Sequence, residues 1–175
     1  DRSSAASDVY KRQGLSVQLS ANPINGLLER IDKGASKKFV IEFKKGADDF
    51  FELDQKGTKV VVRGNNYVNI ATGINWYLKY YAGIQLSWNG MQAKLPQVLP
   101  PVPRKERHET SLSLRYDFNY CTYSYTMAFW DWERWEKEID WMALHGINLP
   151  LAAVGQECIW FNMLQKLGYS KDEIN

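Results

Sequence analysis

Two residues whose types could bind a ligand, Asn119 and Cys121, end an alternating stretch at 112–121. Their polar row also contains Arg115 and Asp117, and apolar side chains fill the positions between. This alternation predicts a β-strand with one polar face. An amide such as that of Asn119 can donate to and accept from a ligand hydroxyl. The alternative for Asn119 is an internal hydrogen bond to a neighbouring loop.

Other chemistry on this face is weakly supported. For Arg115 and Asp117, the pattern favours an internal ion pair or a link to neighbouring strands over a catalytic pair. Cys121 is a poor nucleophile candidate because the two histidines, His108 and His145, lie in a predicted linker and at a predicted helix end. We therefore expect Cys121 to act as a small, polarizable wall of a binding site.

A second candidate pair, Gln156 and Glu157, begins a predicted helix at 156–167. The apolar run at 147–154 before it is typical of a strand buried in a parallel sheet. Between the two strands, Asp131 is the predicted N-cap of an amphipathic helix that ends at Gly146. The carboxyl ends of parallel strands share one edge of a sheet, so both pairs are expected at that edge. Helix capping is the alternative role for the second pair.

The strand–helix–strand–helix order at 111–175 predicts the opening of a β/α barrel or of an open α/β sheet. Two βα units cannot close a barrel of eight, so we expect the chain to be the amino-terminal part of a larger protein. Residues 170–173 form a capping-box pattern that predicts one more helix.

Residues 14–94 predict a small α+β domain that serves as a packing module. Its expected elements are strands at 17–20, 39–43, 50–53, 60–63 and 84–88, and helices from Asn22-Pro23 to Gly34 and from about Ile70 to Gly83. The segment 95–110 holds four of the six prolines and reads as a linker at a domain boundary. Residues 1–13 are polar and patternless, which predicts a non-native or disordered tail.

Composition excludes several functions. The 22 basic and 20 acidic residues give a net charge of +2 without a basic stripe, so nucleic acid is a poor candidate partner. No apolar run is long enough to span a membrane, and the two cysteines match neither a disulfide framework nor a metal site. No Ser/His/Asp set or phosphate loop is present. Glycoside hydrolysis ordinarily needs two carboxylates, and only Glu157 is suitably placed here.

The stretch 115–160 reads RYDFNYCTYSYTMAFWDWERWEKEIDWMALHGINLPLAAVGQECIW. It closely resembles the alpha-N-acetylglucosaminidases, glycoside hydrolase family 89. The resemblance continues to residue 175 and, more weakly, back to about residue 17. It implies an α/β fold in which a small α+β amino-terminal domain precedes the first two βα units of a truncated TIM-type (β/α)8 barrel.

The activity that the resemblance implies is the removal of terminal alpha-linked N-acetylglucosamine, from heparan-type or mucin-type glycans, by an exo-acting enzyme with retention of configuration. Its two catalytic glutamates belong to later barrel strands, so this chain would hold no catalytic residue and be inactive alone. The glycan is the expected partner, and the parent chain would supply the rest of the barrel and a helical domain. Neither a metal nor an organic cofactor is expected. The family implies a lysosomal location in animals and a periplasmic or extracellular one in bacteria.

At the site, Asn119 and Cys121 match the family's Asn-x-Cys, which lines the sugar subsite. Gln156 and Glu157 match its Gly-Gln-Glu after the second strand. The run Ala152-Ala153-Val154 departs from the family's version, which has a Trp and a Ser. The alternative function for the chain is a non-catalytic carbohydrate-binding or structural accessory domain.

Overall fold

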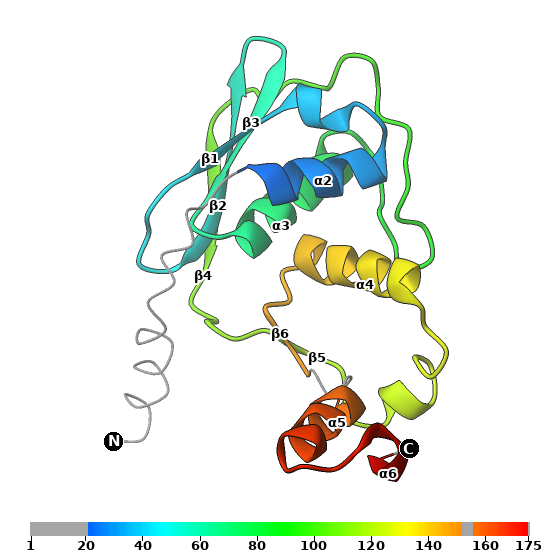
Figure 1. Ribbon diagram of the computed structural model, residues 1–175. Coiled ribbons are helices and arrows are strands. Elements are labelled where there is room, and N and C mark those ends of the chain that lie inside the picture. The colour runs from blue at the N-terminus through cyan, green and yellow to red at the C-terminus, as the bar shows by residue number, and fades with distance from the viewer. Residues whose placement is uncertain (1–20, 152–155, 175) are drawn as a thin grey trace.

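The computed structural model describes residues 21–151 and 156–174, and it has a mixed α/β architecture (Figure 1). A four-stranded sheet with two helices on one face is followed by a smaller part with two parallel strands and three helices. The tail at 1–13 and the strand expected at 17–20 lie outside the described residues.

The sheet has the strand order β1-β3-β2-β4. Its strands are β1 (Phe39–Phe43), β2 (Asp49–Lys56), β3 (Lys59–Gly64) and β4 (Glu106–Thr110). The predicted hairpin is confirmed: β2 and β3 pair antiparallel up to Lys56 and Lys59, and Gly57 takes a left-handed φ of 61° in the turn. β1 pairs parallel to β3, and β4 pairs antiparallel to β2.

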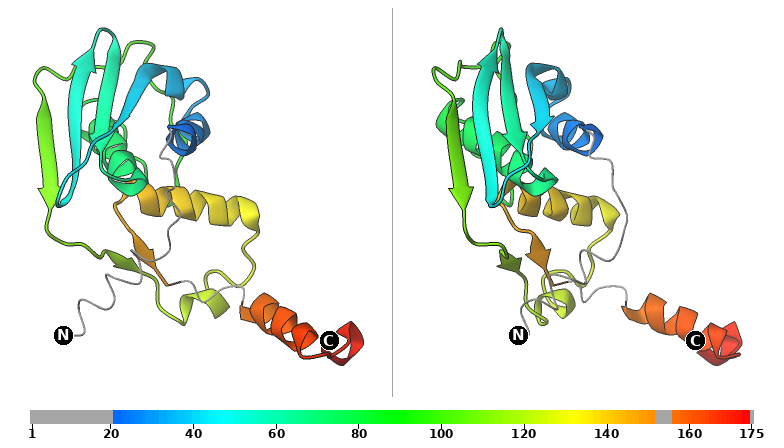
Figure 2. Two further views of the ribbon diagram at one scale, coloured as in Figure 1. Left: turned by 60° about the vertical axis from the view of Figure 1, so that its left-hand side comes forward. Right: turned by 90° about the vertical axis from the view of Figure 1, so that its left-hand side faces the viewer.

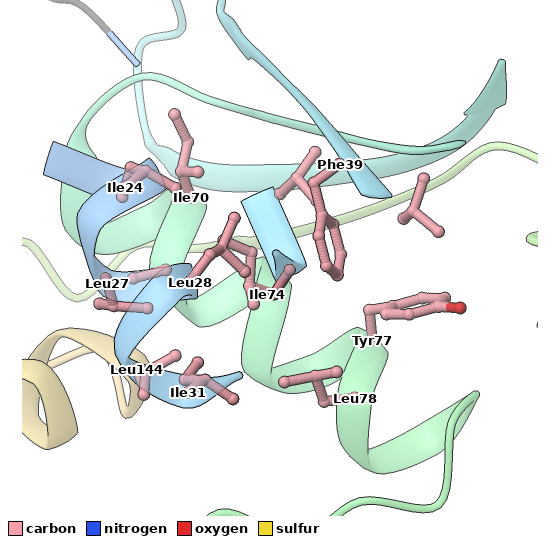
Figure 3. Close-up of a cluster of buried hydrophobic side chains, with 14 of the residues drawn as sticks. Ile24, Leu27, Leu28, Ile31, Phe39, Ile70, Ile74, Tyr77, Leu78 and Leu144 are labelled. Atoms are coloured by element: carbon pink, nitrogen blue, oxygen red, sulfur yellow. The ribbon is translucent and has the colours of Figure 1, made fainter. Parts of the chain in front are cut away.

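Helices α2 (Asn22–Ile31) and α3 (Tyr67–Tyr80) cover one face of this sheet (Figure 2). Asn66 caps α3, since its Oδ1 accepts from the backbone N–H of Asn69 at 2.9 Å. The start of α2 near Pro23 is confirmed, although its N-cap is Ala21, without a side-chain hydrogen bond, rather than Asn22. The core between helices and sheet is built from large apolar side chains (Figure 3), among them Leu27, Leu28, Ile31, Phe39, Ile70, Ile74, Tyr77, Leu78 and Leu144.

The segment after α3 differs from the expected strand and linker. The strand expected at 84–88 is wrong: the segment has no strand, and Ser87 forms an isolated bridge with Gly90, with both backbone hydrogen bonds at 3.0 Å across a tight turn. The Pro-rich segment is packed: Leu95, Leu99 and Val102 are buried, and the Tyr77 hydroxyl donates to the carbonyl of Pro100 at 2.6 Å. The last five residues of the expected linker form β4. Apolar side chains between the prolines therefore bind this segment to the core.

The smaller part contains β5 (Tyr116–Asp117), α4 (Trp132–Leu144), β6 (Leu149–Pro150), α5 (Gln156–Lys166) and α6 (Lys171–Ile174). The order of elements agrees with the prediction, whereas both strands are only two residues long. α4 packs against α3, and α5 and α6 project away from the rest (Figure 2). The capping box is confirmed: the backbone N–H of Ser170 donates to Glu173 Oε2 at 2.8 Å, and the backbone N–H of Glu173 donates to the Ser170 hydroxyl at 3.4 Å.

Candidate functional site

The parallel pair β5–β6 positions the candidate site. Tyr116 pairs with Leu149 and Asp117 with Pro150, and the backbone N–H of Leu151 donates to the Asp117 carbonyl at 3.0 Å. Both strands therefore end at the same edge. The Asn119 turn follows β5 at that edge, and α5 is the next described element after β6 in the sequence.

Asn119 lies in an exposed turn just after β5, ahead of the short 3-10 helix η2 (Thr122–Ser124). Its Oδ1 accepts from the backbone N–H of Cys121 at 2.9 Å and of Thr122 at 3.3 Å. An internal hydrogen bond is thus present, but within its own turn rather than to a neighbouring loop. Within residues 21–151 and 156–174, the Nδ2 group of Asn119 has no hydrogen-bond partner, so two N–H donors remain available to a ligand.

Cys121 is an exposed free thiol at the start of η2. The two histidines are engaged elsewhere: His145 Nδ1 lies 2.8 Å from the Trp141 carbonyl, and His108 stacks on Phe51. In the described part of the chain neither histidine lines a cavity with Cys121. Among the described residues, neither histidine is therefore placed as a base for thiol chemistry at Cys121, and the thiol is exposed.

Phe118, directly before Asn119, is an apolar position of the alternating stretch, and the pattern gave no sign of its backbone conformation. Its φ of 72° is left-handed, the only such value at a non-glycine residue in the described part of the chain. Its backbone N–H donates to Asp117 Oδ1 at 2.7 Å, and its ring packs edge-on against Tyr123 and Trp135. This conformation ends β5. Of the predicted strand 112–121 only Tyr116–Asp117 is a strand, so the prediction is wrong for 112–115 and 118–121, and Asn119 and Cys121 lie in a turn rather than on a strand face.

Arg115 links neighbouring elements and does not pair with Asp117. Its Nη2 lies 2.8 Å from Asp49 Oδ2 on β2 and 3.3 Å from Asn69 Oδ1 on α3. Its Nε donates to the carbonyl of Gly146, and Nη1 donates to that of Leu112 at 2.6 Å. Of the two structural alternatives drawn from the sequence, the internal ion pair with Asp117 is wrong. Arg115 instead joins the small part to the sheet.

Gln156 and Glu157 occupy the first turn of α5, as predicted, and Glu157 is exposed. A helix amino terminus favours a nearby carboxylate, and it presents backbone N–H groups to a ligand. The run Ala152-Ala153-Val154, which departs from the family's version, lies outside the described residues.

Two hollows lie beside Phe118. One has a volume of about 390 Å³ and is partly polar. It is lined by Asp117, Thr122 and Thr126 together with Trp88, Phe118, Met127, Glu138 and Trp141. The other has a volume of about 400 Å³ and is almost wholly apolar. It is lined by Phe118, Tyr123, Trp132, Trp135, Ile139, Met142, Pro150 and Leu151. Phe118 forms part of the lining of both, so its position shapes the surroundings of the turn.

Across the described ranges, no three His, Cys, Asp or Glu side chains are grouped so that they could hold a metal ion. None of the helices in those ranges is long and apolar enough to cross a membrane.

Two family models match the chain. Residues 22–101 match the N-terminal domain of alpha-N-acetylglucosaminidase, and residues 115–175 match its TIM-barrel domain. The human alpha-N-acetylglucosaminidase is 42% identical over 144 residues, which are 82% of this chain and 19% of that protein.

Solved structures of a family 89 glycoside hydrolase from Clostridium perfringens are also similar. The complex with PUGNAc has a TM-score of 0.79 at 39% identity, covering 87% of this chain and 18% of that one. A variant in complex with its substrate GlcNAc-alpha-1,4-galactose gives the same values. The chain thus spans about a fifth of the length of these relatives.

Proposed function

The chain belongs to the alpha-N-acetylglucosaminidase family, glycoside hydrolase family 89, and on this basis we propose that its parent protein is an exo-acting glycosidase. The parent removes terminal alpha-linked N-acetylglucosamine from a glycan with retention of configuration. The substrate bound to the C. perfringens relative, GlcNAc-alpha-1,4-galactose, supports a ligand of this class.

Within the parent, the chain contributes an amino-terminal α+β domain and the first two βα units of the TIM-type barrel. Asn119, Cys121, Gln156 and Glu157 contribute to the sugar subsite. The observation that carries this proposal is the parallel pair β5–β6: the Asn119 turn follows the carboxyl end of β5, and α5 follows β6 in the sequence. In β/α proteins that edge holds the binding chemistry.

Each residue has a role that its chemistry permits. The free Nδ2 group of Asn119 donates to a sugar oxygen while its Oδ1 holds the turn. Cys121 forms an uncharged wall beside it, and Gln156 and Glu157 bind hydroxyl groups from the start of α5. A retaining mechanism needs two carboxyl groups about 5 Å apart. Both glutamates that do this work come from later strands of the barrel, so the chain alone has no hydrolase activity. By family, the parent acts in lysosomes in animals and outside the cytoplasm in bacteria.

Hydrolysis of an aryl alpha-N-acetylglucosaminide by the full-length parent tests this function. We expect turnover of the alpha-linked substrate, none of its beta-linked isomer, and release of the alpha-anomer of N-acetylglucosamine as the first product, seen by proton NMR. Binding without turnover would instead support the accessory carbohydrate-binding function. Turnover by the isolated chain would overturn its assignment as a non-catalytic contributor to the site.

A further inference from the structure

Trp88, in the tight turn after α3, reaches across to the smaller part of the molecule. Its indole Nε1–H donates to Glu138 Oε2 on α4 at 2.7 Å. The Glu138 side chain is only 2% exposed, so this carboxylate depends on its protein partners in place of water. A residue of the amino-terminal part thus supplies a hydrogen bond to a buried charge in the part that carries Asn119.

Arg134 completes the contact. Its Nη2 lies 2.9 Å from the same Glu138 Oε2, one helical turn away. Its guanidinium carbon lies 4.7 Å from the centre of the Trp88 ring and 4.0 Å from that of Trp130. Cation–π contacts with two indoles and an ion pair with a buried carboxylate hold these side chains in one arrangement.

Aromatic contacts continue from Trp130 to the turn. Trp130 packs edge-on against Trp135, with ring centres 5.0 Å apart. The ring centre of Trp135 lies 6.3 Å from that of Tyr123 and 6.4 Å from that of Phe118. Phe118 and Tyr123 enclose the four residues 119–122 in the sequence, so their rings fix both ends of the turn. Trp88, Phe118 and Thr122 also line one hollow together.

We infer that Trp88 is a positioning residue for the sugar-binding turn, acting through the cluster formed by Trp88, Trp130, Arg134, Trp135 and Glu138. This inference rests on the proposed function. The amino-terminal part then serves the reaction directly, because its Trp88 sets where the Asn119 amide points. A displacement of a binding group by a fraction of an ångström weakens the contact that it makes with the substrate.

The experiment uses the full-length parent with an aryl alpha-N-acetylglucosaminide as substrate and N-acetylglucosamine as competitive inhibitor. Trp88→Phe keeps a ring and removes the donor to Glu138. We expect it to lower kcat/KM about threefold or more and to weaken inhibition by N-acetylglucosamine. Tyr80→Phe is the matched control, since it also removes one polar group from an aromatic side chain, which is 58% exposed at the end of α3. It should leave both constants unchanged.

A double mutant separates positioning from general destabilisation. If Trp88 acts through the turn, the loss in kcat/KM for Trp88→Phe with Asn119→Ala is smaller than the product of the two single losses. Partial unfolding would instead lower kcat alone, leave KM and the inhibition constant unchanged, and make the losses multiply.

The possible failures are distinct. If Asn119→Ala lowers kcat/KM while Trp88→Phe has no effect, or the losses multiply, the role of Trp88 is wrong and the sugar site stands. Wild-type kcat/KM in Asn119→Ala overturns both the site and the inference.

Discussion

Arg115 Nη2 lies 2.8 Å from Asp49 Oδ2, and both side chains are only 17% exposed. These residues are separated by 66 positions and join the residue before β5 to the first residue of β2, an inner strand of the four-stranded sheet. The ion pair is therefore one of the contacts, with the Trp88–Glu138 hydrogen bond and the packing of α3 on α4, that hold the small part against the larger one. Because Arg115 also donates to backbone carbonyls at Leu112 and Gly146, its replacement leaves several acceptors without their donor.

Removing one partner of this pair should destabilise the chain. We expect Asp49→Asn to lower the free energy of unfolding by about 2–4 kcal/mol, because it leaves a largely buried guanidinium without its carboxylate partner. Urea unfolding of the chain measures this. Lys137→Ala is the control: its pair with Glu133 is also 2.8 Å long but is 51% and 77% exposed, so less than about 1 kcal/mol should be lost. Equal losses in the two variants would contradict the assigned role of Arg115.

The two functional groups of the Asn119 amide can be separated in the full-length parent. Asn119→Asp keeps an oxygen that accepts from Cys121 and Thr122 but removes the Nδ2 donor. Asn119→Ala removes both. If Nδ2 binds the sugar, both variants should lower kcat/KM by about tenfold or more while Asn119→Asp shifts the melting temperature little. Near-normal kinetics in Asn119→Asp alone would make Asn119 a turn-capping residue.

Because Phe118 has a left-handed backbone conformation, we expect glycine to be more stable than alanine at this position. At most positions Gly is less stable than Ala, but a φ of 72° penalises any side chain with a Cβ. Both Phe118→Gly and Phe118→Ala lose the ring contacts with Tyr123 and Trp135. We expect the Gly variant to be the more stable by about 1 kcal/mol in urea unfolding. A more stable Ala variant would show that the turn relaxes to an ordinary φ.

Glu52 on β2 makes the free energy of unfolding depend on pH. Burial raises the pKa of its carboxyl, but the cationic groups of Lys44, Lys105 and Arg107, each within 3.2 Å of a carboxylate oxygen, outweigh burial and lower the pKa from 4.5 to about 2. A lowered folded-state pKa stabilises the fold above the unfolded pKa of 4.5, and this stabilisation is lost as the pH falls toward 2. The stabilisation that the lowered pKa of Glu52 provides above pH 4.5 is about 3 kcal/mol.

Glu52→Gln removes this titration. The variant should therefore be less stable than the wild type at pH 7 and lose less of its remaining stability between pH 4.5 and pH 2. Urea unfolding at a series of pH values gives both curves. Parallel curves would show that Glu52 titrates alike in the folded and unfolded chain.

Local patterns in the sequence predicted most of the elements. The hairpin of β2 and β3, the amphipathic stripes of α3 and α4, and the capping box at Ser170 are fixed by neighbouring residues, so their spacing was sufficient. The alternation at 112–121 predicted a strand there, but only Tyr116–Asp117 is one, and Asn119 and Cys121 lie beyond its end.

Features that depend on distant residues were missed. Nothing around Phe118 signals a left-handed φ, because the conformation is supported by Trp135, which lies in another element. The Arg115–Asp49 pair joins two separate parts of the chain. The prolines of 95–110 suggested a linker, whereas Leu95 and Leu99 decided its packing.

The packed Pro-rich segment determines how the amino-terminal domain can be separated from its parent. A domain expressed only to residue 94 lacks three side chains of its own core, Leu95, Leu99 and Val102, together with the edge strand β4. It would expose the paired edge of β2 and invite aggregation. A piece that extends through Thr110 keeps these three side chains and β4 and lacks only Leu144 of the fully buried core, so recombination between related enzymes should preserve folding better when the crossover falls after β4 than at the prolines.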